Sequence, residues 1–200
     1  VFQRLAPIAK KLELPEDWRT ELKPSDDVGE RPSLDTLGPF RWAPSAATQW
    51  TLVDGQGKKH SLSDYAGKPV IVIFYLGKGC AHCIEQLSAF APEVDRFKQT
   101  GIDLIAISTD HVGGLLETFQ LNQNKPFPFP LLSDASLEVF KQYRAYDDFE
   151  KQPLHGTFLI DRAGLVRWQD ISYEPFEEVE FLLNESKRLL AQDPPQVTKR

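Results

Sequence analysis

The stretch VIVIFYLGKGCAHC, residues 70–83, decides the fold class. Val70–Tyr75 is a β-branched and aromatic run without polar alternation, which is typical of a strand covered on both faces. A glycine-containing loop then leads to Cys80-Ala81-His82-Cys83. Apolar residues follow at helical spacing, at Ile84, Leu87, Phe90, Val94 and Phe97. The stretch therefore predicts a buried strand that leads directly into an amphipathic helix.

The elements on either side alternate between strand and helix. Hairpins are predicted over Trp50–Leu62 and Gly156–Ile171, each around a glycine turn. Two further strands are expected, over Ile102–Ile107 and at Leu131–Leu132. Three helices are expected between the hairpins: one over Cys80–Gln99 kinked at Pro92, one over Val112–Asn122 capped at Asp110-His111, and one capped by Ser133 and Asp134 that ends at Tyr143. A closing helix is expected with Pro175 in its first turn and with Val179, Leu182, Leu183 and Leu190 on its apolar face. This order predicts a central sheet between helical layers.

Residues 1–45 differ in composition from the rest of the chain. Six of the fifteen prolines lie there, which predicts an extended arm or linker with one short helix near Leu5–Leu12. We expect the folded domain over 46–192 and a tail over 193–200. Because the chain opens with Val1 and contains no Met, we also expect it to be part of a longer protein whose other domains are its partners.

Composition excludes several classes of function. The 200 residues are 41% hydrophobic and 26% charged, which is typical of a globular domain. The net charge of −6 and the lack of a basic patch argue against nucleic acid as a partner. The longest apolar run, Val70–Leu76, is too short to span a bilayer, and no secretion leader is visible. The cellular compartment stays open.

The two cysteines of the chain predict redox chemistry. Cys80 falls at the start of the expected helix, where free N–H groups and the helix dipole favour a thiolate. We expect Cys83, one turn later and on the side of Leu87, to be more buried. The spacing of three brings both sulfurs to one face, so that they can form a disulfide reversibly. His82 between them is a candidate for stabilising the thiolate.

Inert cysteines, a structural disulfide and a zinc site account less well for the Cys-x-x-Cys motif. Inert cysteines could lie anywhere in the core, so this interpretation does not explain why both cysteines stand where a strand leads into a helix. A structural disulfide would close too small a loop to add much stability. A zinc site needs four ligands, and His60, His111 and His155 are scattered along the sequence. We therefore expect no metal and no organic cofactor.

Four stretches resemble the alkyl hydroperoxide reductase/thiol-specific antioxidant family of peroxiredoxins and their relatives. They are HSLSDYAGKPVIVIFYLGKGCAHCIEQL, GIDLIAISTD, FPLLSD and GTFLIDRAGLVRW, and the resemblance covers Trp50–Leu190. It implies an α/β, thioredoxin-like fold of the peroxiredoxin type. Such a fold is a three-layer sandwich with a central mixed sheet flanked by helices.

The chain departs from this family's pattern at the supporting positions. The resemblance implies that the peroxidatic cysteine corresponds to Cys83, while Cys80 stands at the family's Thr or Ser position and Leu76 at its Pro position. His155 stands where the family has a peroxide-binding Arg. It is a candidate proton donor or acceptor beside the dithiol, or alternatively a hydrogen-bonded loop histidine. The cis-Pro of the thioredoxin branch corresponds to Gly156.

These observations predict a thiol-based oxidoreductase in which Cys80 or Cys83 attacks and the other cysteine resolves the product to a disulfide. The substrate is an oxidised protein or a peroxide, and Leu76 and His155 favour disulfide exchange. A thioredoxin-like protein or a small thiol would supply the electrons. Exposure favours Cys80 as the attacking residue, and the resemblance favours Cys83. The alternative is a non-catalytic thioredoxin-like module for binding.

Overall fold

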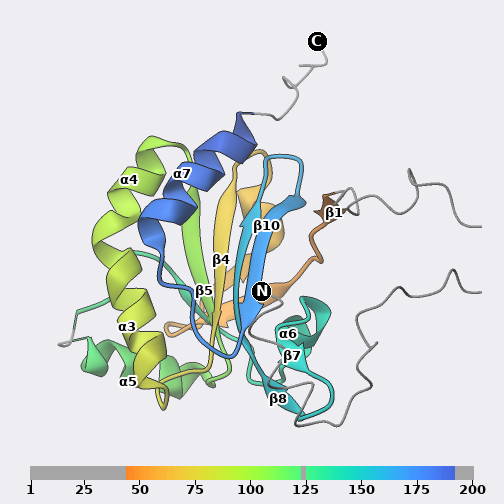
Figure 1. Ribbon diagram of the computed structural model, residues 1–200. Coiled ribbons are helices and arrows are strands. Elements are labelled where there is room, and N and C mark those ends of the chain that lie inside the picture. Colours follow the sequence, from red (N-terminus) through yellow and green to blue (C-terminus); the bar gives the residue numbers. More distant parts are fainter. Residues whose placement is uncertain (1–43, 123–124, 192–200) are drawn as a thin grey trace, which may run out of the picture. The chain divides into compact units, whose positions relative to one another are not determined.

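An eight-stranded sheet forms the centre of the fold (Figure 1). The computed structural model describes residues 44–122 and 125–191. Across the sheet the strands are β1 (Ser45–Ala46), β10 (Leu165–Ser172), β9 (His155–Ile160), β4 (Val70–Tyr75), β5 (Asp103–Ser108), β6 (Leu131–Ser133), β2 (Thr51–Asp54) and β3 (Lys59–Ser61). The pairs β4–β5 and β5–β6 are parallel and the remaining pairs are antiparallel, so the sheet is mixed.

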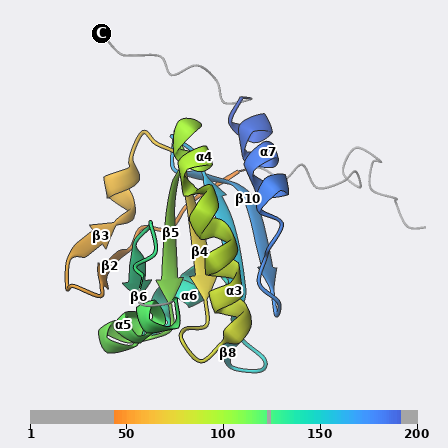
Figure 2. The same cartoon turned by 90° about the vertical axis from the view of Figure 1, so that its left-hand side faces the viewer.

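Helices cover both faces of strand β4, which lies in the middle of the sheet. All six of its side chains are at most 1% exposed. Because neighbouring side chains of a strand point to opposite faces, alternate residues of β4 join two separate apolar clusters. One face packs under α3 (Ala81–Phe90), α4 (Val94–Gln99), α5 (Val112–Leu121) and α7 (Val179–Leu190), and the other under α6 (Glu138–Gln142) and the 3-10 turn η1 (Leu62–Tyr65) (Figure 1 and Figure 2). The predicted sandwich with a central mixed sheet is confirmed.

The segment that decided the fold class lies as predicted. β4 has the bounds expected from the sequence, and α3 begins directly after Cys80. The helix predicted over Cys80–Gln99 is interrupted by a 3-10 turn, η2 (Ala91–Glu93), which contains Pro92. Proline lacks the N–H that a continuous α-helix would use, and the α-helix is broken where the sequence predicted a kink.

Two helices begin later than predicted. The helix expected directly after Ser133 and Asp134 starts only at Glu138, because Leu137 has a left-handed backbone with φ of 60°. Asp134 still acts on this helix, since its carboxylate accepts the N–H of Phe140 at 2.9 Å. The closing helix begins at Val179 and not around Pro175, although Leu182, Leu183 and Leu190 are buried as expected.

Three short strands could not be predicted from the sequence. The two-residue strands β1, β7 (Tyr146–Asp147) and β8 (Gln152–Pro153) are too short to show a period.

The helix expected near Leu5–Leu12, nearly all of the predicted arm and the predicted tail lie outside the described residues. Among the helices that the structure describes, none has the length and apolar composition needed to cross a membrane.

The aromatic side chain of Phe74 anchors the α6 face of the sheet. Its ring centroid lies 5.0 Å from that of Phe140, 5.1 Å from that of Tyr143 and 5.4 Å from that of Phe158. We expect Phe74→Ala to lower the free energy of unfolding by about 3–5 kcal/mol, measured by chemical denaturation, because it leaves a cavity in this cluster.

Phe149 provides the matched control, because its side chain is 89% exposed. Phe149→Ala should change the free energy of unfolding by less than about 0.5 kcal/mol. Similar losses in the two variants would contradict the assignment of Phe74 to the core.

Candidate active site

The two cysteines lie where β4 leads into α3, and their environments differ. Cys80 is the N-cap residue of α3, and its Sγ accepts the backbone N–H of Cys83 at 3.3 Å. Its side chain is partly exposed, whereas Cys83 is fully buried in the same apolar cluster as Leu87. The expected difference in burial is confirmed. Both residues are free cysteines in this structure.

Burial sets the protonation of Cys83. The loss of solvent raises the pKa of its thiol well above the usual value, and the contact with Cys80 acts in the same direction. The backbone N–H of Leu76, which donates to Cys83 Sγ at 3.2 Å, opposes this rise only in part. The protonated thiol is therefore the favoured form of Cys83.

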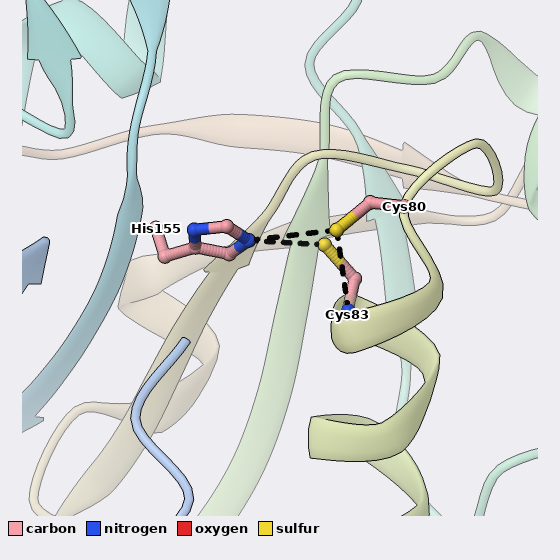
Figure 3. A group of neighbouring side chains, drawn as sticks. All are labelled: Cys80, Cys83 and His155. Atoms are coloured by element: carbon pink, nitrogen blue, oxygen red, sulfur yellow. Dashed lines mark hydrogen bonds between the residues drawn. The ribbon is translucent and has the colours of Figure 1, made fainter. Parts of the chain in front are cut away.

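The side chain of His155 faces both sulfurs (Figure 3). Its Nε2 lies 3.2 Å from Cys83 Sγ and 3.7 Å from Cys80 Sγ. Its Nδ1 lies 2.7 Å from the carbonyl oxygen of Tyr173, which can only accept, so Nδ1 bears the hydrogen. Burial lowers the pKa of His155 and favours the neutral ring. The free lone pair of Nε2 then points at the two thiols.

Strand register explains how residues so distant in the sequence meet. β4 and β9 are antiparallel and Phe74 pairs with Gly156, so His155 lies beside the carboxyl end of β4. The loop to Cys80 begins at that same end. His155 is the first residue of a buried strand, and not a loop histidine.

Thr109 and Asp110, which directly follow strand β5 (Asp103–Ser108), hold the loop between β4 and α3. We call their two hydrogen bonds to this loop the brace. Asp110 accepts the backbone N–H of Lys78 at 2.8 Å, and Thr109 Oγ1 donates to the carbonyl oxygen of Leu76 at 2.9 Å. The side chain of Lys78 also contacts Glu117. The cap of the following helix was expected at Asp110-His111, and the N-cap of α5 is His111. The carboxylate of Asp110 instead helps to fix the loop that presents the Leu76 N–H to Cys83.

His82 lies apart from the two sulfurs and His155. Its side chain is 63% exposed, and its Nδ1 lies 3.4 Å from a carboxylate oxygen of Glu174. The structure thus brings together three of the four predicted site residues. The groups that the sequence did not indicate are the N–H of Leu76, the carbonyl of Tyr173 and the carboxylate of Asp110. Two of these belong to the backbone, for which side-chain identity gives no signal.

Three of these side chains lie close enough together to hold a metal ion. Cys80, Cys83 and His155 each offer one ligand atom, and these atoms lie within 4.8 Å of one another. Two sulfurs and one imidazole nitrogen are donors that suit zinc and other borderline or soft ions.

The difference in burial predicts a difference in thiol reactivity. The Cys83→Ser variant keeps Cys80, and the Cys80→Ser variant keeps Cys83. We expect iodoacetamide to alkylate Cys83→Ser at least about ten times faster than Cys80→Ser at neutral pH, because Cys80 is more accessible and the pKa of Cys83 is raised. Mass spectrometry of timed samples gives both rates. Equal rates, or a faster reaction of Cys83, would overturn this order.

A substitution at Gly77 tests whether the brace holds the loop between β4 and α3 in place. Its φ is 92°, and a Cβ at this position would lie 2.7 Å from the carboxylate of Asp110. We expect Gly77→Ala to lower the free energy of unfolding by about 1–3 kcal/mol and, on the Cys80→Ser background, to speed alkylation of Cys83.

Gly79 in the same loop provides the matched control, because a Cβ there has no heavy atom within 4 Å. Gly79→Ala should leave both quantities nearly unchanged. A Gly77→Ala variant as stable as Gly79→Ala, with the same Cys83 alkylation rate, would rule out the brace.

Known proteins share this fold and parts of this sequence. The pattern of the AhpC/TSA family matches residues 44–169. Peroxiredoxin Q from the chloroplast of Oryza sativa subsp. japonica is 34% identical over 125 residues, which are 62% of this chain and 56% of the relative. The chloroplastic peroxiredoxin Q of Suaeda salsa is 37% identical over 119 residues, or 59% of this chain and 54% of the relative. The chain thus spans about half the length of these curated relatives.

Solved structures agree on the fold. Peroxidoxin BcpB from Mycobacterium tuberculosis superposes with a TM-score of 0.64 and 22% identity, covering 76% of this chain and 97% of that one. Reduced 2-Cys peroxiredoxin from Plasmodium vivax gives a TM-score of 0.63 at 20% identity, covering 74% and 96% of the two chains. The resemblance inferred from the sequence is confirmed, and the chain belongs to the AhpC/TSA family.

Proposed function

We propose that this chain is a thiol peroxidase that cycles between the Cys80–Cys83 dithiol and its disulfide. The observation on which the proposal rests is the position of His155, whose unprotonated Nε2 faces both sulfurs at 3.2 and 3.7 Å. Membership of the AhpC/TSA family and the relatives named peroxiredoxin Q support peroxide as the substrate. The activity belongs to the domain predicted over residues 46–192.

Cys80 is the attacking residue in this proposal. It is the partly exposed sulfur, and the Cys83 N–H and the N-terminus of α3 stabilise a negative charge on it. His155 accepts the Cys80 proton, and the thiolate attacks one oxygen of the peroxide. The O–O bond breaks, Cys80 becomes a sulfenic acid, and the other oxygen leaves as an alcohol or water with the proton from His155.

Cys83 then resolves the sulfenic acid. His155, neutral again, takes the proton from Cys83 Sγ at 3.2 Å. The Cys83 sulfur attacks Cys80 Sγ, hydroxide leaves and takes the proton from His155, and one water and the disulfide are formed. Two thiol groups of an external donor, a thioredoxin-like protein or a small thiol, reduce the disulfide by exchange and are themselves oxidised to a disulfide.

Disulfide exchange with an oxidised protein is the second candidate function. The sequence favoured it because Leu76 and His155 replace peroxide-handling residues of the family, and the partial exposure of Cys80 at a helix N-terminus also suits it. Family membership favours peroxide reduction over this exchange. A non-catalytic binding module, the third candidate, requires that the dithiol does not turn over.

The test measures peroxide consumption and insulin reduction by the full chain with dithiothreitol as the donor and a chelator present. We expect peroxide consumption to exceed insulin reduction. Cys80→Ser should lower peroxide consumption at least about a hundredfold. Cys83→Ser should allow formation of a sulfenic acid at Cys80, trapped by dimedone, but no disulfide. Replacing the base by His155→Ala should cost about a hundredfold.

His111→Ala is the matched control, because His111 is an exposed histidine outside the site. It should keep the full rate. Faster insulin reduction than peroxide consumption would favour disulfide exchange. Rates that do not respond to Cys80→Ser and Cys83→Ser would leave only the binding module.

A further inference from the structure

The site brings together three potential metal ligands that are far apart in the sequence. The sequence argued against zinc because His155 is far from the two cysteines along the chain. The register of β9 against β4 removes that separation and places the donor atoms of Cys80, Cys83 and His155 within 4.8 Å of one another. We propose that the reduced chain binds one zinc-type divalent cation through these three residues, with water as the fourth ligand.

The distances fit such an ion. Zinc lies about 2.3 Å from thiolate sulfur and about 2.05 Å from imidazole nitrogen, so a tetrahedral angle places sulfur and nitrogen about 3.6 Å apart. The two distances here are 3.2 Å from His155 Nε2 to Cys83 Sγ and 3.7 Å to Cys80 Sγ. Both sulfur–nitrogen distances therefore lie within a few tenths of an ångström of the value that the ion requires.

The imidazole is already oriented as a ligand. A metal-bound histidine usually donates its other ring N–H to a carbonyl or carboxylate, which fixes the ring and the tautomer. His155 does so through Nδ1, 2.7 Å from the Tyr173 carbonyl oxygen. The lone pair of Nε2 is free to bind a cation without rotation of the ring.

Charge and burial favour a divalent ion over a monovalent one. Two thiolates and a doubly charged cation are neutral together, which suits a site where Cys83 is 0% and His155 is 4% exposed. A monovalent ion would leave one negative charge buried, at a high cost in solvation. Cys80 is the partly exposed member, so water as the fourth ligand would reach the ion from the side of Cys80.

Binding is linked to the redox state of the dithiol. The ion displaces one proton from each thiol, and both protons go to solvent. The disulfide has no thiolate to offer, so the oxidised chain binds the ion much more weakly. The consequence for activity, that the bound ion protects both sulfurs from peroxide, rests on the proposed function, whereas the binding itself does not.

The test titrates Zn²⁺ into the reduced, chelator-treated full chain without oxygen, against a chromogenic zinc chelator as competitor. We expect one Zn²⁺ per chain, release of two protons per ion in weak buffer, and loss of thiol reactivity toward Ellman's reagent. The disulfide form should bind at least about a hundredfold more weakly. His155→Ala should lower the affinity at least about tenfold, and His111→Ala should leave it unchanged.

Binding that is equal in the reduced and disulfide forms of the unmutated chain would overturn the proposal, and that comparison needs no variant to fold. Failure to bind, or equal binding by His155→Ala and His111→Ala, would also overturn it. Peroxide consumption measured separately with chelator present distinguishes the two proposals. Activity without zinc binding removes only this inference, and zinc binding without activity removes only the proposed function.

Discussion

The hydrogen bond from His155 Nδ1 to the carbonyl oxygen of Tyr173 is the interaction on which the rest of the site depends. In the opposite tautomer, Nε2 would carry the hydrogen and face the thiols as a donor, able neither to take a proton nor to bind a cation. Two further hydrogen bonds fix the segment that carries this carbonyl. The Tyr173 hydroxyl donates to Asp147 at 2.6 Å, and the buried amide of Gln86 on α3 donates to the Phe176 carbonyl at 2.9 Å.

The sheet supplies the second constraint, because it decides where His155 stands. Gly156 pairs with Phe74 of β4, and a Cβ on Gly156 would lie 2.8 Å from the ring of Phe158 and 3.3 Å from Ala145. A larger residue would force β9 or its neighbours to move. Since His155 is the adjacent residue, the close packing at Gly156 maintains the distance from Nε2 to the sulfurs.

The sequence predicted those parts of the fold whose local pattern agrees with their environment. Val70–Tyr75 is apolar throughout and is buried on both faces, and the break at Pro92 follows from the missing N–H. The predicted start of α6 was wrong because the left-handed conformation of Leu137 has no signature in a leucine. The predicted start of the closing helix was wrong because a proline fits a loop, where Pro175 lies, as well as it fits the first turn of a helix.

The sequence predicted the candidate site to about the same extent as it predicted the fold. The Cys-x-x-Cys at a strand–helix junction identified both sulfurs and their difference in burial, and the resemblance to the family identified the position of His155. Sequence proximity favoured His82 as a partner of the dithiol, but on α3 its side chain points to solvent and Glu174. The roles of Asp110 and the backbone groups depend on tertiary contacts that no spacing encodes.

In the proposed mechanism, histidine at the position of the family's arginine changes the way in which the thiols are activated. A guanidinium keeps its charge and can only donate, so it favours a thiolate that is formed before the substrate arrives. Neutral His155 can instead remove the proton during the reaction. The pair of imidazolium and thiolate that results has no net charge, which limits its cost in a site where Cys83 and His155 are buried. The raised pKa of Cys83 is compatible with its proposed role, because in this mechanism that thiol ionises only when His155 is free to accept its proton.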